Sequence, residues 1–201
     1  MPRPSDLLAP RASVSRQQRE RRNGHRGAAI LLTGLPASGK STLAQALQAE
    51  LFARGAQSLV LDGDALRGGL NSDLGFGPVD RQENIRRASE LAALLVEQGQ
   101  VVILALIAPL IELRELFARR LGADYHEVWC SAPLAVCEQR DPKGHYARAR
   151  RGELPGFTGV SAPYEPPPAA ALVLDTAGQP VDVCLEQLLA WLSECRVLPA
   201  P

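Results

Sequence analysis

The sequence contains no long apolar run. Nowhere do about 18 consecutive apolar residues occur, as a membrane-spanning helix requires. The first residues also lack the apolar core of a secretory signal peptide. Basic and acidic residues number 22 each, so no overall positive charge favours nucleic acid as a partner. We therefore expect a soluble, cytoplasmic protein that binds neither membranes nor nucleic acid.

Patterns typical of metal sites and disulfide frameworks are also missing. The four cysteines, at positions 130, 137, 184 and 195, form no Cys-x-x-Cys pair, and the three histidines are scattered. Zinc sites and disulfide-stapled folds depend on closely spaced ligands or cysteines. We predict reduced, mostly buried thiols, and surface or packing roles for the histidines.

Lysine is rare, because only Lys40 and Lys143 occur among the 22 basic residues. Charge is unevenly placed as well: residues 1–26 hold seven arginines against Asp6 and Glu20. We interpret 1–26 as a basic, partly disordered N-terminal arm, with a partner-binding or substrate-covering role as the alternative. The length of 201 residues then leaves 27–197 as one folded domain.

Short apolar runs alternate with helical patterns along this domain. The runs that indicate buried strands are 28–33, 58–61, 101–107, 125–130 and 171–174. Helical periodicity covers 40–54, 80–98, 110–121, 133–140 and 180–194. This alternation predicts a three-layer α/β fold, with a five-stranded parallel sheet and helices on both faces. Residues 141–168 are rich in glycine and proline, which favours a functional lid over a disordered insert.

The segment after the first predicted strand matches the phosphate-binding loop (P-loop) motif G-x-x-x-x-G-K-[ST] at every fixed position. In this motif Lys40 would neutralise the β- and γ-phosphates, and the Ser41 hydroxyl would bind Mg²⁺. No Asn-Lys-x-Asp guanine-reading motif occurs, which favours ATP over GTP. The predicted ATP-binding residues here are Gly34, Leu35, Pro36, Ala37, Ser38, Gly39, Lys40, Ser41 and Thr42. The fold class is then that of P-loop nucleoside-triphosphate hydrolases.

Two carboxylates, Asp62 and Asp64, end the second predicted strand, at the edge where ligands bind in open α/β sheets. They can position Mg²⁺ or accept a proton from an acceptor hydroxyl. The alternative is that they are helix-capping or turn aspartates. Several arginines and Phe76 follow within 67–87. Forked guanidinium groups beside an aromatic ring suit an anionic acceptor that carries a ring.

These residues carry a resemblance to the adenylylsulfate kinase family. The resembling stretches are Asp62-Gly63-Asp64-x-x-Arg67, Gly69-Leu70-Asn71-x-Asp73-Leu74-Gly75-Phe76 and Asp80-Arg81-x-Glu83-Asn84-Ile85-Arg86-Arg87. The predicted lid agrees through Arg140-Asp141-Pro142-Lys143-Gly144-x-Tyr146, Phe157-Thr158-Gly159 and Pro163-Tyr164-Glu165. The likeness covers about 15–195, including the second half of the arm. It implies an ATP-dependent kinase that phosphorylates the 3′-hydroxyl of adenylyl sulfate in sulfate activation.

The resemblance also implies roles for individual residues. Catalysis would rest on Lys40, Asp62 and Asp64, and Mg²⁺ would be held by Ser41, Asp62 and Asp64, partly through water. Arg140 would lie beside the ATP adenine. The residues implied for adenylyl sulfate are Asp64, Arg67, Phe76, Arg81, Asn84, Ile107, Ala108, Lys143, Phe157 and Thr158, with its adenine between the two phenylalanines. A homodimer and a functional link to a separate ATP sulfurylase are implied as well.

The sequence departs from the family at 108, where Ala108 replaces a common serine, and at 110, where Leu110 replaces a common tyrosine. Alanine cannot be phosphorylated, so we predict direct transfer from ATP to the acceptor without a phosphoserine step. Two alternatives stay open. One is a P-loop kinase for another small anionic metabolite, and the other is a nucleotide-binding partner protein without catalytic activity.

Overall fold

The computed structural model describes residues 13–199 and is built on one parallel sheet. Its strands are β1 Ala28–Thr33, β2 Ser58–Asp62, β3 Val101–Ala105, β4 Tyr125–Ser131 and β5 Leu172–Asp175. The order across the sheet is β2-β3-β1-β4-β5, and every neighbouring pair is parallel. The predicted five-stranded parallel sheet is confirmed. The sequence pattern did not specify the order of its strands.

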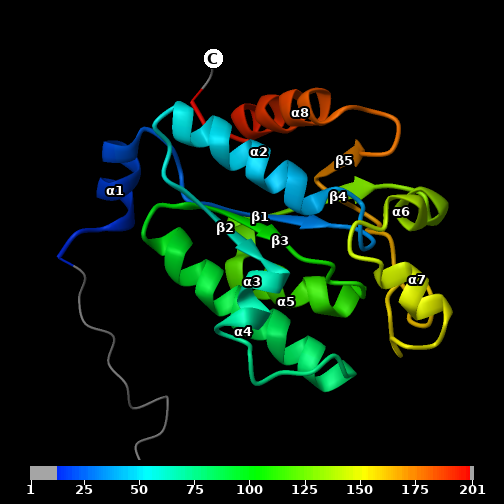
Figure 1. Cartoon of the computed structure of the whole chain (residues 1–201). Coiled ribbons are helices and arrows are strands. Elements are labelled where there is room, and N and C mark those ends of the chain that lie inside the picture. The colour runs from blue at the N-terminus through cyan, green and yellow to red at the C-terminus, as the bar shows by residue number, and fades with distance from the viewer. Residues whose placement is uncertain (1–12, 200–201) are drawn as a thin grey trace, which may run out of the picture.

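Helices cover both faces of the sheet, as predicted (Figure 1). Helices α2 (Lys40–Ala53) and α8 (Val181–Glu194) pack on one face, and α4 (Pro78–Glu97) and α5 (Ile111–Leu121) pack on the other. All six residues of β1 are buried, and its apolar side chains alternate between the two cores. Ile30 and Leu32 face the α2–α8 side, whereas Ala29 and Leu31 face the α4–α5 side. Such two-sided burial explains why this central strand is a continuous apolar run.

Two element boundaries differ from the prediction. The third strand ends at Ala105 and not at position 107, because the chain leaves the sheet there and Ala108 takes a left-handed conformation with φ of 39°. Residues 63–68 form a short helix, α3 (Gly63–Gly68), that the apolar pattern did not reveal. The Asp62 carboxylate caps this helix by accepting a hydrogen bond from Asp64 N. The capping interpretation of Asp62 is thus confirmed, although the same carboxylate also lies in the site described below.

The predicted lid, residues 141–168, follows α6 (Leu134–Arg140) and is irregular except for α7 (His145–Arg150). Helix α7 lies at one end of the sheet, and α1 (Arg16–Asn23) lies at the opposite end (Figure 1). The predicted lid is therefore at the end of the sheet where the strands have their carboxyl termini. Among residues 13–199, no helix combines the length and apolar character needed to cross a membrane.

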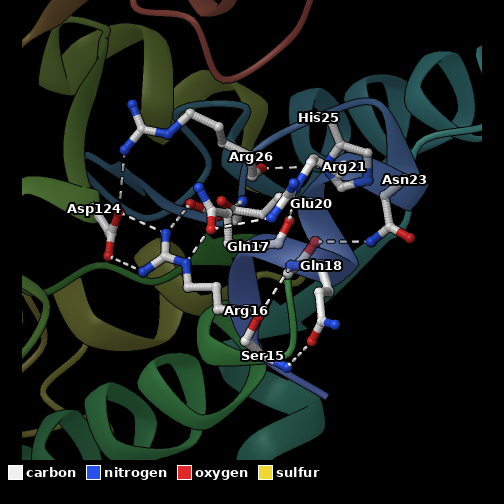
Figure 2. A network of polar contacts seen from close by, with 12 residues as sticks. Ser15, Arg16, Gln17, Gln18, Glu20, Arg21, Asn23, His25, Arg26 and Asp124 are labelled. Atoms are coloured by element: carbon white, nitrogen blue, oxygen red, sulfur yellow. Dashed lines mark hydrogen bonds and ion pairs between the residues drawn. The ribbon is translucent and has the colours of Figure 1, made fainter.

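Part of the predicted basic arm is an ordered helix. A capping box between Ser15 and Gln18 begins α1. The Arg16 guanidinium donates to both Asp124 oxygens at 2.6 and 2.8 Å and to Gly27 O at 2.9 Å (Figure 2). The Glu20 carboxylate accepts from Arg16 Nε and from Gly27 N. Residues 16–23 of the arm that we predicted to be partly disordered are therefore helical, and residues 1–12 lie outside the described residues.

Candidate functional site

A cavity of about 940 Å³ opens at the carboxyl ends of the strands. It brings together most residues that the sequence analysis selected from distant segments. The selected residues that line it are Pro36, Ala37, Gly39, Lys40, Ser41, Thr42, Asp62, Asp64, Arg67, Phe76, Arg81, Asn84, Ile107, Ala108, Arg140, Lys143, Phe157 and Thr158. Three selected residues, Gly34, Leu35 and Ser38, do not line it: Ser38 is fully buried, and Leu35 lines a neighbouring cavity.

The P-loop backbone depends on two glycines. A Cβ on Gly34 would lie 2.6 Å from Cys130 O and 2.6 Å from Ser38 Oγ, so no side chain fits there. Gly39 begins α2 with φ of 95°, a left-handed conformation that favours glycine. The loop therefore closes tightly between β1 and the N-terminus of α2. Such a helix N-terminus presents free N–H groups and positive potential to phosphate.

The Lys40 ammonium lies within this loop, and the residue is only 8% exposed. Its Nζ donates to Leu35 O at 2.7 Å and to Gly34 O at 3.1 Å. Burial lowers the pKa of Lys40 from 10.5 to about 8, although the charges of Asp62 and Asp64 oppose this shift. Because the ammonium is shielded from water, its charged form is stabilised by P-loop carbonyls or by a phosphate-like anion.

Oxygen atoms suited to Mg²⁺ meet beside the loop. The Ser41 hydroxyl donates to Asp62 Oδ2 at 2.6 Å, which joins the P-loop to the end of β2. Residues 13–199 contain no cluster of three His, Cys, Asp or Glu side chains that could hold a metal alone. Mg²⁺ is usually bound through one or two carboxylates together with waters and substrate phosphates. The hydroxyl and carboxylate pair fits this binding mode.

Two arginines form a positive region on the far side of the cavity. Arg67 lies over the Phe76 ring, 4.3 Å from its centroid, and Arg81 donates to Phe76 O at 2.8 Å. Neither arginine forms an ion pair with a carboxylate among residues 13–199. Burial lowers the pKa of both guanidinium groups, and the charge of Arg67 lowers that of Arg81 further. Because Arg67 and Arg81 have no ion-pair partner among residues 13–199, this side of the cavity favours an anionic ligand.

The amide of Asn84 is held from behind by a residue that the sequence analysis did not place in the site. Asn71 Nδ2 donates to Asn84 Oδ1 at 2.9 Å, and both side chains are buried. With its oxygen engaged, Asn84 has its own Nδ2 left to donate into the cavity it lines. Asn71 thus orients a residue that the resemblance places against the acceptor.

The predicted lid contacts both halves of the cavity. On the P-loop side, the Tyr146 hydroxyl donates to Pro36 O at 3.0 Å. On the other side, Arg81 donates to Gly156 O at 2.8 Å, and Lys143 forms an ion pair with Asp64. Phe157 packs edge-on against Tyr146, with ring centroids 5.0 Å apart. The segment 141–158 therefore spans the cavity from one side to the other.

Sequence reasoning missed the residues at the α8 end of the cavity. These are Thr176, Gln179, Pro180, Val181 and Cys184. Arg140, which the resemblance places beside the ATP adenine, donates from Nη2 to Thr176 O at 2.7 Å. Their place in the site could have been predicted from the order of elements, because the loop after β5 begins at the same edge of the sheet as the P-loop. Helix α8 was predicted over 180–194 without a role in the site, and its first turn proves to line the cavity.

All four cysteines are free, and Cys130, Cys137 and Cys184 are buried. Burial raises the pKa of Cys130 to about 12 and raises the pKa of the other three thiols as well. The prediction of mostly buried, unpaired thiols is confirmed. Raised thiol pKa values make these side chains poor nucleophiles.

A parallel sheet with a P-loop, a hydroxyl–carboxylate pair and an arginine-lined pocket at one edge defines a P-loop kinase that acts on small molecules. The family model described as adenylylsulphate kinase matches residues 26–175. This chain belongs to the adenylylsulphate kinase family, whose members are ATP-dependent transferases.

Curated relatives agree with this assignment. The adenylyl-sulfate kinase of Bacillus licheniformis is 48% identical over 190 residues, covering 94% of this chain and 96% of that protein. The adenylyl-sulfate kinase of Paraburkholderia xenovorans is 53% identical, covering 83% of this chain and 93% of that protein.

Solved structures agree as well. Mycobacterium tuberculosis APS kinase CysC, solved in complex with AMPPNP and APS, matches with a TM-score of 0.81 and 42% identity. The match covers 84% of this chain and 99% of that one. A hexameric APS kinase from Thiobacillus denitrificans matches at 28% identity and a TM-score of 0.68, covering 92% of this chain and 33% of that one.

Proposed function

We propose that this chain transfers the γ-phosphoryl group of ATP to the 3′-hydroxyl of adenylyl sulfate, giving 3′-phosphoadenylyl sulfate and ADP in sulfate activation. The observation that carries the proposal is one cavity that joins a P-loop to two arginines and two aromatic rings. A nucleotide acceptor with an anionic tail needs both kinds of side chain. Membership of the adenylylsulphate kinase family supports the same reaction.

In this proposal the P-loop, residues 34–42, holds the ATP phosphates, and Lys40 neutralises their β/γ oxygens. Arg140, bonded to Thr176 O, flanks the ATP adenine at the α8 end of the cavity. Mg²⁺ would bind through Ser41, Asp62 and Asp64, partly through water, and would neutralise the charge that develops on the phosphates. The hydrogen bond between Ser41 and Asp62 supports this ligand set.

Adenylyl sulfate would occupy the other half of the cavity. Its phosphate and sulfate would contact Arg67, Arg81 and Lys143, and its adenine would lie between Phe76 and Phe157. Asn84, Thr158 and the backbone at Ile107 and Ala108 would complete its polar contacts. Phe76 is 66% exposed, which supports a stacking role, because an exposed aromatic ring at the mouth of a cavity is available to a ligand.

The transfer itself would be direct and in line. Asp64, at the start of α3, would accept the proton of the 3′-hydroxyl as that oxygen attacks the γ-phosphorus. The bond from the γ-phosphorus to ADP would break as the bond to the 3′-oxygen forms. Ala108 offers no hydroxyl for a phosphoenzyme. Closure of the predicted lid, residues 141–168, would exclude water and prevent ATP hydrolysis.

We also propose that the chain works as a cytoplasmic homodimer and receives adenylyl sulfate from a separate ATP sulfurylase. Free, buried cysteines are consistent with a reducing compartment. The hexameric relative from Thiobacillus denitrificans supports self-association within the family. Analytical ultracentrifugation of the full chain would separate a dimer from a monomer and from a hexamer.

The decisive experiment is a coupled assay of ADP release from MgATP, with and without adenylyl sulfate. Mass spectrometry would identify the product as 3′-phosphoadenylyl sulfate. Lys40→Ala and Asp64→Ala control for contaminating activity, and both are expected to lose acceptor-dependent turnover. If ATP binds but adenylyl sulfate neither binds nor accelerates ADP release, the proposal is wrong. Another anionic acceptor, or a non-catalytic binding role, would then follow.

A further inference from the structure

Arg114 on α5 is a buried charge with no role in the site described above. The residue is 2% exposed, and it does not line the cavity. A buried guanidinium group is costly unless its donors and its charge are both satisfied. Its partners therefore indicate what it stabilises.

The guanidinium group joins three segments that are far apart in the sequence. Nη1 donates to Ala108 O at 2.9 Å, and Nη2 donates to Glu165 O at 2.9 Å. Nε lies 2.5 Å from Glu127 Oε1 on β4, which balances the charge. The Tyr164 ring lies 5.9 Å from the guanidinium carbon. Arg114 thus links the segment 106–111, which we call the acceptor loop, to 164–165, which we call the lid end.

Further hydrogen bonds connect the same two segments directly. Glu165 N donates to Pro109 O at 2.8 Å, and Ile111 N donates to Glu165 Oε2 at 2.7 Å. The Thr33 hydroxyl at the end of β1 donates to Ile107 O at 2.6 Å and lies 3.1 Å from the Tyr164 hydroxyl. The acceptor loop, the lid end and the strand that leads into the P-loop therefore meet around one guanidinium group.

The conformation of the acceptor loop needs this support. Ala108 is buried and has φ of 39°, a left-handed conformation that is unfavourable for a residue with a Cβ. Such conformations persist when surrounding contacts fix them. The hydrogen bond from Arg114 Nη1 fixes the carbonyl group of Ala108 itself.

We propose that Arg114 is a positioning residue that holds the acceptor loop and the lid end in one arrangement, so that acceptor binding and lid closure are coupled. This inference rests on the proposed function, in which the backbone at 107–108 contacts adenylyl sulfate. An arginine is required because its planar fork directs separate N–H groups to two carbonyls while Nε faces a carboxylate. A lysine ammonium keeps the charge but cannot reach the three acceptors in that geometry.

The test compares Arg114→Lys with the wild type in steady-state kinetics and in amide hydrogen exchange. We expect the KM for adenylyl sulfate to rise roughly tenfold or more, with the KM for ATP within about twofold, because Arg114 bonds the acceptor loop and the lid end and not the P-loop. We also expect faster exchange at Glu165 N and Ile111 N, whose bonds join the two segments. Arg119→Lys is the matched control, since Arg119 lies on the same helix in an exposed ion pair with Glu115.

Several outcomes would overturn the inference. One is an unchanged KM for adenylyl sulfate in Arg114→Lys. Another is an equal rise of both KM values with a lowered melting temperature, which would show a merely structural role. If Arg114→Lys does not fold, Tyr164→Phe replaces it: loss of the Tyr164–Thr33 contact should raise the KM for adenylyl sulfate roughly threefold without raising that for ATP. An unchanged value in Tyr164→Phe would contradict the inference.

The same experiment separates this inference from the proposed function. If the wild-type chain does not phosphorylate adenylyl sulfate, the proposed function fails on that result alone. The exchange rates of Glu165 N and Ile111 N still report whether Arg114 holds the two segments together. If the wild type is active and these amides exchange in Arg114→Lys as they do in the wild type, the positioning role alone is wrong.

Discussion

The ammonium of Lys143 is ion-paired with the carboxylate of Asp64, and this pair links the predicted lid to the carboxyl end of β2. Lys143 and Lys40 are the only lysines in the sequence, and both line the same cavity. The pairing raises the pKa of Lys143, chiefly through its hydrogen bond to Asp64, so this lysine stays charged. A cation and a carboxylate are thereby brought together where the acceptor hydroxyl and its anionic tail would lie.

Replacing Lys143 by methionine tests the role of this cation. We expect kcat/KM for adenylyl sulfate to fall roughly 100-fold, because a charge-assisted contact to an anion is lost. The KM for ATP should change little, since Lys143 lies in the part of the cavity that we propose for the acceptor. The matched control is Arg148→Met, which removes an exposed cation from the same segment. Equal losses for both substrates would contradict an acceptor-specific role.

Asparagine substitutions separate the two aspartates. Asp64→Asn should lower kcat by a factor of about 10² to 10⁴, the usual contribution of a general base. Asp62→Asn should instead raise the Mg²⁺ concentration needed for half-maximal activity, because Asp62 bonds the Ser41 hydroxyl. Titrations of Mg²⁺ at saturating substrates measure both effects. A normal kcat in Asp64→Asn would remove this residue from proton transfer.

Nucleotide affinity should depend on pH through Lys40, whose pKa burial lowers to about 8. Phosphate binding favours the charged ammonium, so ATP binding takes up a proton as pH rises above about 8. The Kd for ATP should then increase by up to about tenfold per pH unit. Calorimetry in buffers of different ionisation enthalpy measures that uptake, and Lys40→Met should abolish it. A pH-independent Kd between about pH 7 and pH 9.5 would refute this assignment.

The same shift affects stability without nucleotide in the opposite direction. Between the folded pKa of about 8 and the unfolded value of 10.5, the unfolded chain binds more protons. The contribution of Lys40 to the free energy of unfolding should therefore rise with pH across this window. Urea unfolding of wild type and Lys40→Met at both ends of this window isolates the contribution. A Lys40 contribution that does not change with pH would show that burial leaves its pKa unshifted, and one that falls with pH would show a pKa raised in the folded state.

Helix α1 should depend on Arg16. Arg16→Ala removes two hydrogen bonds to Asp124 and one to Gly27 O, and should lower the free energy of unfolding by about 1–2 kcal/mol. Arg21→Ala is the control, because the Arg21 side chain bonds to Gln17 within the same helix. Chemical denaturation measures both variants. Equal stability of the two would mean that the Arg16 contacts contribute nothing.

The P-loop should reject a side chain at Gly34. In Gly34→Ala the Cβ would meet Cys130 O and Ser38 Oγ at 2.6 Å, so the loop must shift and ATP binding should be lost. Gly55→Ala is the matched control, because Gly55 also has positive φ, yet a Cβ there would meet no atom of residues 13–199 within 4 Å. Calorimetric titration with MgATP distinguishes them. Normal ATP affinity in Gly34→Ala would show that the loop tolerates the displacement.

The fold class and the centre of the site could be predicted because their signals are local. A strand buried on both faces reads as an apolar run, and the P-loop needs fixed residues over eight positions. Asp62, the last residue of β2, and Asp64 were placed at the site because parallel strands present their carboxyl ends at one edge. In contrast, α3 was missed because six residues are too few to show a helical period.

Long-range contacts account for what sequence reasoning could not place. Helix α1 buries no residue, so it has no apolar stripe, and it is ordered by an ion pair between Arg16 and Asp124, 108 positions apart. The contacts of Arg114 could not be predicted, because its partners lie on a loop, a strand and the lid end. Thr176 and Cys184 line the cavity because β5 ends at the same edge of the sheet as the strand before the P-loop.

The alternation of strands and helices, the P-loop, and the placement of Asp62 and Asp64 at the carboxyl edge of the sheet can be predicted from the amino-acid order. These features follow from periodicity and from motifs whose residues are neighbours in the chain. Folding was needed to establish the strand order, the end of β3 at Ala105, the ordering of α1 and the contacts around Arg114. Those depend on atoms from distant segments, whose hydrogen bonds and charges leave no local pattern.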